Sequence, residues 1–240
     1  DARPATLGAA ARISGVTNRS SATSAAGVTP EIRAAGDYPM TVTFTAEDFA
    51  AQSNVSRETV GRLETYAALL EKWQKSMNLV GPATISDLWR RHFLDSAQLV
   101  PLLPSMDIEL LDFGSGAGFP GLVLSVMGVR SVHLVEANTR KCAFLREAAR
   151  EIGANVRIHN ARIETLTPWP VDVVTARAVA PLPQLMEYAN PYMAPNSICL
   201  FLKGKRHKDE LTKAQKLWDI RVHTLKSSVD PEGVILQVER

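Results

Sequence analysis

The chain is poor in cysteine: among its 240 residues only Cys142 and Cys199 occur. They are far apart in the sequence and form no Cys-x-x-Cys pair, which argues against a disulfide framework and against a zinc site. The five histidines are scattered without the spacing of metal ligands, so we expect no metal. Two isolated cysteines fit a reducing compartment, and we expect a cytoplasmic protein.

Long apolar runs and an excess of one charge are also missing. No apolar run approaches the ~18 residues that a membrane span needs, so we expect no membrane partner. The net charge is only +2, from 27 basic and 25 acidic residues. Any binding of nucleic acid must therefore depend on clustered charge rather than on the overall charge.

Residues 1–39 are rich in Ala, Ser, Thr and Gly and have no sustained apolar periodicity. Such a composition buries too little apolar surface to offset the entropy of ordering. We interpret this stretch as a disordered extension or as a leader added for expression. A third interpretation is a mitochondrial transit peptide, because Arg3, Arg12 and Arg19 outnumber the acidic residues at the start.

Residues 40–105 are expected to form an N-terminal helical segment that packs on the rest of the protein. A short helix is predicted over residues 46–51. Ser56 is a suitable N-cap for a long helix that ends near Met77, and a further helix is predicted over residues 85–103.

From residue 106 to residue 240 we expect one catalytic domain of alternating strands and helices. Strands are predicted at residues 109–113, 131–136, 155–159, 171–176, 197–202, 221–226 and 234–239. Helices are predicted at residues 120–127, 138–152, 182–193 and 207–218. Strands separated by helices imply a mostly parallel, doubly wound sheet of the α/β class, covered on both faces. The last two strands have no helix between them, so the seven-stranded sheet should end in an antiparallel hairpin.

A glycine-rich loop follows the first predicted strand, where residues 110–121 run LLDFGSGAGFPG. Glycines permit a positive φ and let a ligand approach the backbone. A dinucleotide fingerprint, Gly-x-Gly-x-x-Gly, would place its third glycine at position 119, which is Phe119. The chain has instead a pattern that resembles motif I of the class I S-adenosylmethionine-dependent methyltransferases: Asp112-x-Gly114-x-Gly116-x-Gly118. Its acidic residue suits the cationic end of that cofactor.

Residues after the next strands extend the candidate cofactor site, because ligands of open α/β sheets bind at the carboxyl ends of the strands. Glu136 ends the second strand and can accept both ribose hydroxyls of an adenosine. Residues 160–164 follow the third strand and are expected to cover one face and edge of the adenine. Arg162, within this stretch, can serve the cofactor carboxylate or an anionic substrate.

Cationic residues gather at the same edge of the predicted sheet. Arg177 ends the fourth strand among valines, and a guanidinium buried there needs a carboxylate, a ligand or a phosphate as its partner. The others follow strand ends or lie on the preceding helical segment: Arg90, Arg91, His92, Arg140, Lys141, Arg162, Lys203, Lys205 and Arg206. A nearly neutral chain that collects cations at one site indicates a polyanionic substrate such as nucleic acid.

Several motifs, in order along the chain, resemble those of one family. They are Trp73…Asn78-Leu79, Arg91-His92, Asp95-Ser96, the glycine loop, Arg140-Lys141, Phe144-Leu145, Arg162-Ile163-Glu164, Arg177-Ala178 and Leu202-Lys203-Gly204. Over about residues 55–240 the chain is similar to the bacterial small-subunit ribosomal RNA guanine-N7 methyltransferases, also called the glucose-inhibited division protein B family.

The resemblance implies S-adenosylmethionine as cofactor and a guanine in a conserved loop of 16S ribosomal RNA as target, in free RNA or in a small-subunit particle. It implies cofactor contacts for Gly114, Phe119, Ile163, Glu164 and Arg177. We expect Arg177 and Lys203 to act on the target nucleotide, the other cations to contact RNA, and the enzyme to be a monomer.

Guanine N7 has a free lone pair, so in-line methyl transfer needs positioning rather than a general base. The Asn/Asp-Pro-Pro-aromatic motif of methyltransferases that act on exocyclic amines is absent after the fourth strand. Three other interpretations stay open: a small-molecule methyltransferase on the same fold, a dinucleotide-dependent oxidoreductase, and a non-catalytic RNA-binding protein. The glycine spacing argues against the oxidoreductase.

Overall fold

The computed structural model describes residues 43–240, so the predicted leader at residues 1–39 lies outside the described residues. Seven strands form one sheet in the order β3-β2-β1-β4-β5-β7-β6. Their bounds are β1 Glu109–Phe113, β2 Ser131–Glu136, β3 Val156–Asn160, β4 Val171–Arg177, β5 Met193–Lys203, β6 Arg221–Lys226 and β7 Val234–Glu239. The first five strands are parallel, and β7 is antiparallel to both β5 and β6. The predicted doubly wound sheet with an antiparallel hairpin at one edge is confirmed.

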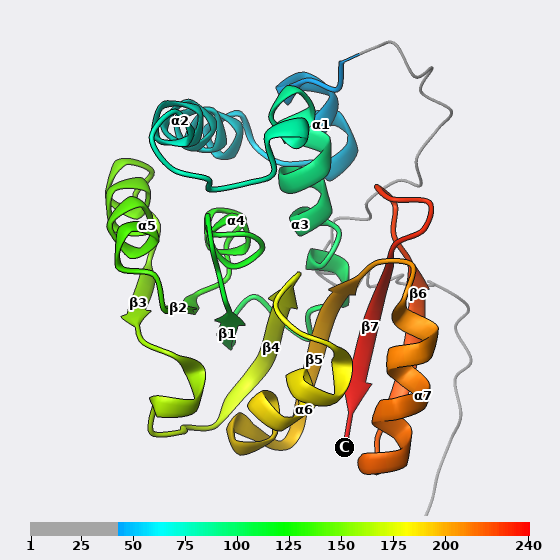
Figure 1. Cartoon of the computed structure of the whole chain (residues 1–240). Coiled ribbons are helices and arrows are strands. Elements are labelled where there is room, and N and C mark those ends of the chain that lie inside the picture. Colours follow the sequence, from blue (N-terminus) through cyan, green and yellow to red (C-terminus); the bar gives the residue numbers. More distant parts are fainter. Residues whose placement is uncertain (1–42) are drawn as a thin grey trace, which may run out of the picture.

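Helices cover both faces of the sheet, which is why the central strands β1 and β4 are almost continuously buried. The helices that follow the strands are α4 Gly121–Val126, α5 Thr139–Glu151, α6 Leu182–Ala189 and α7 His207–Leu217. Figure 1 shows α4 and α5 on one side of the sheet and α6 and α7 on the other. Each layer has its own apolar core, one containing Leu122 and Phe144 and the other Leu185 and Ala214.

The N-terminal segment begins with two capped helices. Helix α1 (Ala46–Ser53) starts with a capping box, in which Thr45 and Asp48 exchange side-chain and backbone hydrogen bonds. Helix α2 (Arg57–Gln74) has Ser56 as its N-cap, as predicted, because the Ser56 side chain accepts a hydrogen bond from the Thr59 backbone amide.

The prediction of one continuous helix over residues 85–103 is wrong. The chain instead forms a 3-10 turn (Pro82–Asp87), a π-helix (Trp89–Leu94), the short α3 (Asp95–Ala97) and a second 3-10 turn (Val100–Leu102). Mid-helix π turns are common at functional sites. Here the irregular backbone carries side chains that bond to Arg177, so tertiary contacts override the local preference for a regular helix.

Smaller differences occur where proline interrupts an element. The helix predicted over residues 182–193 ends at Ala189 and continues as a 3-10 turn, Asn190–Tyr192. Pro191 explains this ending, because a proline lacks the amide that the next helical turn requires. Strand β5 then starts at Met193, four residues earlier than predicted, and β3 is shifted by one residue.

The helical segment and the sheet share one hydrophobic core, which runs from Phe44 to Ile235. Its centre is a group of buried aromatic rings around Tyr66 of α2. The Tyr66 ring lies 5.3 Å from the ring of Phe93 and 5.3 Å from that of Phe119 in the glycine loop. Phe144 of α5 lies 6.2 Å from Tyr66. The N-terminal helical segment therefore packs directly against the loop after β1.

Candidate functional site

A cavity of about 650 Å³ lies at the carboxyl ends of the parallel strands. Its walls come from the loop after β1, residues 79–84, the π-helix and α3, and the ends of β4 and β5. The loop between β6 and β7 also contributes, because β6 is parallel to β5 and ends at the same edge of the sheet. Segments from across the chain thus meet at one place, which is where ligands bind in this class of fold.

Many of the predicted site residues line this cavity, and several do not. Those that line it are Arg91, His92, Gly114, Gly116, Phe119, Lys141, Arg177, Lys203, Lys205 and Arg206. The predicted residues outside its lining are Asp112, Gly118, Glu136, Arg140, Arg162, Ile163 and Glu164.

The glycine loop has a conformation that other residues would strain. Gly114 has φ +56°, and a Cβ atom there would lie 2.8 Å from Cγ2 of Val179. Gly118 has φ +96°, and a Cβ atom there would lie 2.6 Å from the Tyr66 hydroxyl. At both positions a side chain would overlap with neighbouring atoms and would have to adopt a positive φ. The loop therefore needs glycine there.

Asp112 lies beneath the loop rather than along the cavity. Its carboxylate accepts hydrogen bonds from the Thr175 hydroxyl at 2.8 Å and from the Gly121 amide at 3.4 Å. Burial raises the pKa of Asp112 to about 6. The expectation that Asp112 meets the cationic end of the cofactor is therefore corrected: its carboxylate joins β1 to β4 and to the start of α4.

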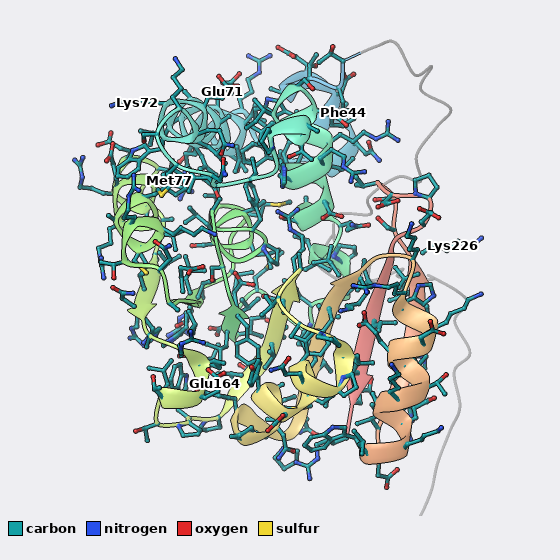
Figure 2. The ribbon with its side chains drawn as sticks, viewed as in Figure 1. Phe44, Glu71, Lys72, Met77, Glu164 and Lys226 are labelled. Carbon is teal, nitrogen blue, oxygen red and sulfur yellow. The ribbon has the colours of Figure 1, made fainter. Side chains whose placement is uncertain are left out.

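Glu136 also bonds to the loop. One of its carboxylate oxygens accepts from the Gly116 amide at 3.0 Å, and the other accepts from the Asn138 amide at 2.7 Å. Ile163 and Glu164 lie on the 3-10 turn Ile163–Thr165. Figure 2 shows Glu164 on the connection between β3 and β4, far from Lys226, which ends β6.

Arg177 lies at the centre of a polar network. Its Nη1 donates to Oδ2 of Asp95 at 3.1 Å and to the Arg91 carbonyl at 3.1 Å. Its Nη2 donates to Nδ1 of His92 at 2.7 Å, and its Cζ lies 5.1 Å from the centre of the Phe119 ring. The prediction that a buried guanidinium here needs a partner is confirmed, since the side chain is only 18% exposed and is paired with Asp95.

His92 is neutral in this arrangement. Arginine only donates, so Nδ1 of His92 must accept from Arg177, and Nε2 then carries the proton and donates to the Thr84 hydroxyl at 2.7 Å. Burial, together with the nearby Arg177 and Arg91, lowers the pKa of His92 to about 3. The expectation that His92 adds positive charge is corrected: it orients Arg177.

Lys203 is likewise engaged within the protein. Its Nζ donates to the Ala180 carbonyl at 2.8 Å and forms an ion pair with Oε2 of Glu210 at 2.6 Å. The same oxygen of Glu210 accepts from the Leu182 amide at 3.0 Å. This cluster joins β5 to the loop after β4, in which Ala178 has φ +55°.

The remaining predicted cations are more exposed. Lys205 and Arg206 follow β5 at the rim of the cavity, and Lys141 lines it from α5. Arg140 is exposed outside the lining and donates to the Ser76 carbonyl at 3.2 Å. Arg162 also lies outside the lining.

Sequence reasoning gave no role to the three acidic residues that line the cavity. Asp95, Glu210 and Asp230 all line the cavity, and each lies within 4.0 Å of a cationic side chain. Asp95 belongs to a motif that the resemblance singles out, but its partner is 82 residues away. No spacing pattern in the sequence identifies such a pair.

Within residues 43–240, no group of three or more His, Cys, Asp or Glu residues could hold a metal ion. Among the helices that the structure describes, none is long and apolar enough to cross a membrane.

Known proteins match this chain over most of its length. The model of the GidB family, rRNA small subunit methyltransferase G, matches residues 59–232. The ribosomal RNA small subunit methyltransferase G of Rhodospirillum rubrum is 56% identical over 194 residues, which are 81% of this chain and 96% of that protein. The enzyme of the same name from Paramagnetospirillum magneticum is 54% identical over 192 residues, 80% of this chain and 94% of that protein.

Solved structures share the fold at low sequence identity. The magnesium protoporphyrin IX methyltransferase of Synechocystis, with bound S-adenosylmethionine, has a TM-score of 0.54 at 15% identity and covers 78% of this chain and 98% of its own. The ribosomal protein L11 methylase of Lactobacillus delbrueckii has a TM-score of 0.53 at 13% identity and covers 61% of this chain and 76% of its own. The predicted class I methyltransferase fold is thereby confirmed.

Proposed function

Because the chain belongs to the GidB family, rRNA small subunit methyltransferase G, we propose that it methylates N7 of a guanine in a conserved loop of 16S ribosomal RNA. One observation supports this proposal most directly. Six cationic residues share one cavity with the glycine loop: Arg91, Lys141, Arg177, Lys203, Lys205 and Arg206. A polyanionic acceptor and a nucleoside-like donor can therefore meet there.

The methyl donor is S-adenosylmethionine, which supplies a methyl group on a cationic sulfur. The described residues fit such a donor, since the glycine loop presents backbone without side chains where Gly114 and Gly116 border the cavity. Glu136 holds the Gly116 amide at 3.0 Å and keeps lone pairs for ribose hydroxyls.

We assign the cofactor to residues around this loop. Some shape the loop or lie in the cavity wall: Gly114, Gly116, Gly118, Phe119 and Arg177. Asp112 contributes to cofactor binding indirectly, because its carboxylate holds β4 and the start of α4 next to the loop. Glu136, Ile163 and Glu164, at the ends of β2 and β3, are assigned to the adenosine.

Methyl transfer to N7 requires that the guanine and the methyl donor be positioned, and it requires no proton transfer. Guanine N7 has a free lone pair, so no base has to remove a proton before the methyl group is transferred. His92, which is neutral and has both ring nitrogens bonded, serves here to orient Arg177. Arg177 and Lys203 are each paired with a carboxylate at the cavity wall and are assigned to the target nucleotide.

RNA phosphates are assigned to the more exposed cations of the rim: Arg91, Lys141, Lys205 and Arg206, with Arg140 and Arg162 outside the cavity. We further propose that the enzyme acts as a cytoplasmic monomer and that its substrate is 16S RNA, free or assembled in a small-subunit particle. An oxidoreductase that uses a dinucleotide, and a small-molecule methyltransferase, are the competing functions.

Mapping of the methylated base tests this function. Purified enzyme is incubated with S-adenosylmethionine labelled in the methyl group and with 16S RNA or small subunits that lack the modification. We expect label on N7 of a single guanine, and strongly reduced transfer by Arg177→Ala. Arg221→Ala is a matched control, because Arg221 pairs with Glu239 at 3.5 Å in an exposed position on β6.

Label on another base or ring position, or no label in either RNA substrate, would contradict the proposal. Wild-type activity of Arg177→Ala would contradict only the role of Arg177. A thermal shift with adenosylhomocysteine but not with NAD would separate the methyltransferase from the oxidoreductase.

A further inference from the structure

The described cavity lining contains three carboxylates, of which two are largely buried and paired with a cation. Asp95 accepts from Arg177 at 3.1 Å through Oδ2 and from the Gln98 amide group at 2.8 Å through Oδ1. Glu210 is paired with Lys203 at 2.6 Å. The side chains of Asp95 and Glu210 are only 15% and 16% exposed.

Asp230, in the loop between β6 and β7, is the third carboxylate and is more accessible, with 39% of its side chain exposed. The ion pair that it forms is long: its Oδ2 lies 4.0 Å from Nη1 of Arg91, which is beyond hydrogen-bond distance. This oxygen is therefore open to a further donor at the cavity wall.

The Asp230 carboxylate is nevertheless held in one orientation. Its Oδ1 accepts from the Glu232 amide at 3.0 Å, its own amide donates to the Ser227 hydroxyl at 3.1 Å, and its carbonyl accepts from the Gly233 amide at 2.9 Å. A Cβ atom on Gly233 would lie 2.9 Å from Cβ of Asp230, so the turn is closely packed.

The whole loop is also anchored to the segment that carries Arg91. The amide of Ser228 donates to Oε1 of Gln98 at 2.9 Å, and Val229 is buried in the main core. Figure 1 shows this loop, in red, beside the segment that contains α3. These contacts hold the loop that places Asp230 in the cavity wall.

A carboxylate among cations that bind a polyanion repels phosphate, so its place in this wall needs another explanation. A carboxylate accepts N–H donors, and extruded bases are read by hydrogen bonds to their Watson–Crick edge. Guanine presents two adjacent donors on that edge, N1–H and the N2 amino group, which suit one carboxylate. Its N7 lies on the opposite edge and stays free for methylation.

We propose that Asp230 recognises the target guanine by accepting hydrogen bonds from N1–H and from the N2 amino group. This inference rests on the proposed function and names the residue that selects the base. Asp230 is a specificity residue and takes no part in the bond that forms to the methyl group.

Replacement of the target guanosine by inosine tests this assignment, because inosine lacks only the 2-amino group. The wild type and Asp230→Asn are compared on the substrate form that the wild type methylates, with guanosine or inosine at the target position. We expect the wild type to favour guanosine in kcat/KM by roughly tenfold or more, the effect of one lost hydrogen bond to a charged group. Asp230→Asn should lose most of this preference and methylate guanosine roughly tenfold more slowly.

Glu232→Gln is the matched control, since it alters a carboxylate of the same loop that does not line the cavity. It should keep the wild-type ratio. Equal ratios in wild type and Asp230→Asn, even with a lower rate in the variant, would overturn the assignment. The proposed function would fail differently, because the wild type would then form no N7-methylguanosine.

Discussion

At the scale of single residues, the site is built from paired charges. Arg177 and Lys203 each have a carboxylate partner within 3.1 Å. Removing one partner of such a buried pair leaves an unpaired charge buried in the protein, which commonly destabilises it by about 3–5 kcal/mol. We therefore expect loss of Asp95 or Glu210 to disturb the cavity as much as loss of the cation itself.

Asp112 links the stability of the fold to pH. Burial raises the pKa of Asp112 in the folded protein to about 6 from an ordinary value of 3.8. Between these values the folded state keeps a proton that the unfolded chain has released. The protonated carboxyl thus stabilises the fold below about pH 4, and this contribution of about 2–3 kcal/mol is lost as the pH rises through 6.

The free energy of unfolding, measured in urea without cofactor from pH 4 to pH 7, checks this prediction. The difference between wild type and Asp112→Asn should change by about 2–3 kcal/mol over this range, with the wild type relatively more stable in acid. Asp219→Asn, in the turn after α7, is the control. A pH-independent difference for Asp112→Asn would contradict the raised pKa.

At the scale of elements, α2 supports the glycine loop. The Tyr66 hydroxyl, on α2, donates a hydrogen bond to the Ala117 carbonyl within that loop. Both residues are buried, and the Tyr66 ring stacks on Phe119 at 5.3 Å. The position of the loop therefore depends on a helix that precedes it by tens of residues in the chain.

Tyr66→Phe should weaken cofactor binding while the fold is kept. The change leaves the Ala117 carbonyl buried without its donor, which we expect to lower the free energy of unfolding by about 1–2 kcal/mol. The Kd for adenosylhomocysteine, measured by calorimetry, should rise roughly threefold to tenfold. Tyr188→Phe, which removes a hydroxyl that bonds to Gln184 on α6, is the control. An unchanged Kd in Tyr66→Phe would show that cofactor binding does not depend on the Tyr66 hydroxyl.

Local sequence predicted most elements well and failed where distant groups intervene. Ser56 and the apolar periodicity after it predict α2 correctly, because capping and amphipathic burial are local effects. The π-helix and α3 were not predicted, because they depend on hydrogen bonds to a distant residue. His92 and Asp95 both bond to Arg177, which lies 85 residues after His92 and 82 residues after Asp95.

At the scale of the whole molecule, a net charge of +2 conceals an uneven distribution. The rim of the cavity carries Lys205 and Arg206 beside each other, while the carboxylates of Asp95 and Glu210 are largely buried in ion pairs. Binding of RNA should therefore depend steeply on salt, because each phosphate that is neutralised releases condensed counterions.

The double variant Lys205→Ala/Arg206→Ala should bind RNA more weakly and with a shallower salt dependence. The slope of log K against log salt concentration should fall by about 1 for each phosphate that is no longer neutralised. Filter binding at several salt concentrations measures this slope. Lys213→Ala/Lys216→Ala on α7, outside the cavity lining, is the control pair. Equal slopes for wild type and the Lys205/Arg206 variant would place the RNA elsewhere.

The sequence by itself determined the fold class, the glycine loop and the cationic character of the site, because strand periodicity, glycine spacing and residue type are properties of short stretches. Only the tertiary structure decided which charges are free and which are paired. It buried Asp112 beneath the loop, made His92 neutral, paired Arg177 and Lys203 with carboxylates, and brought Asp230 into the cavity wall. These outcomes depend on burial and on contacts between residues far apart in the chain, and no local pattern encodes them.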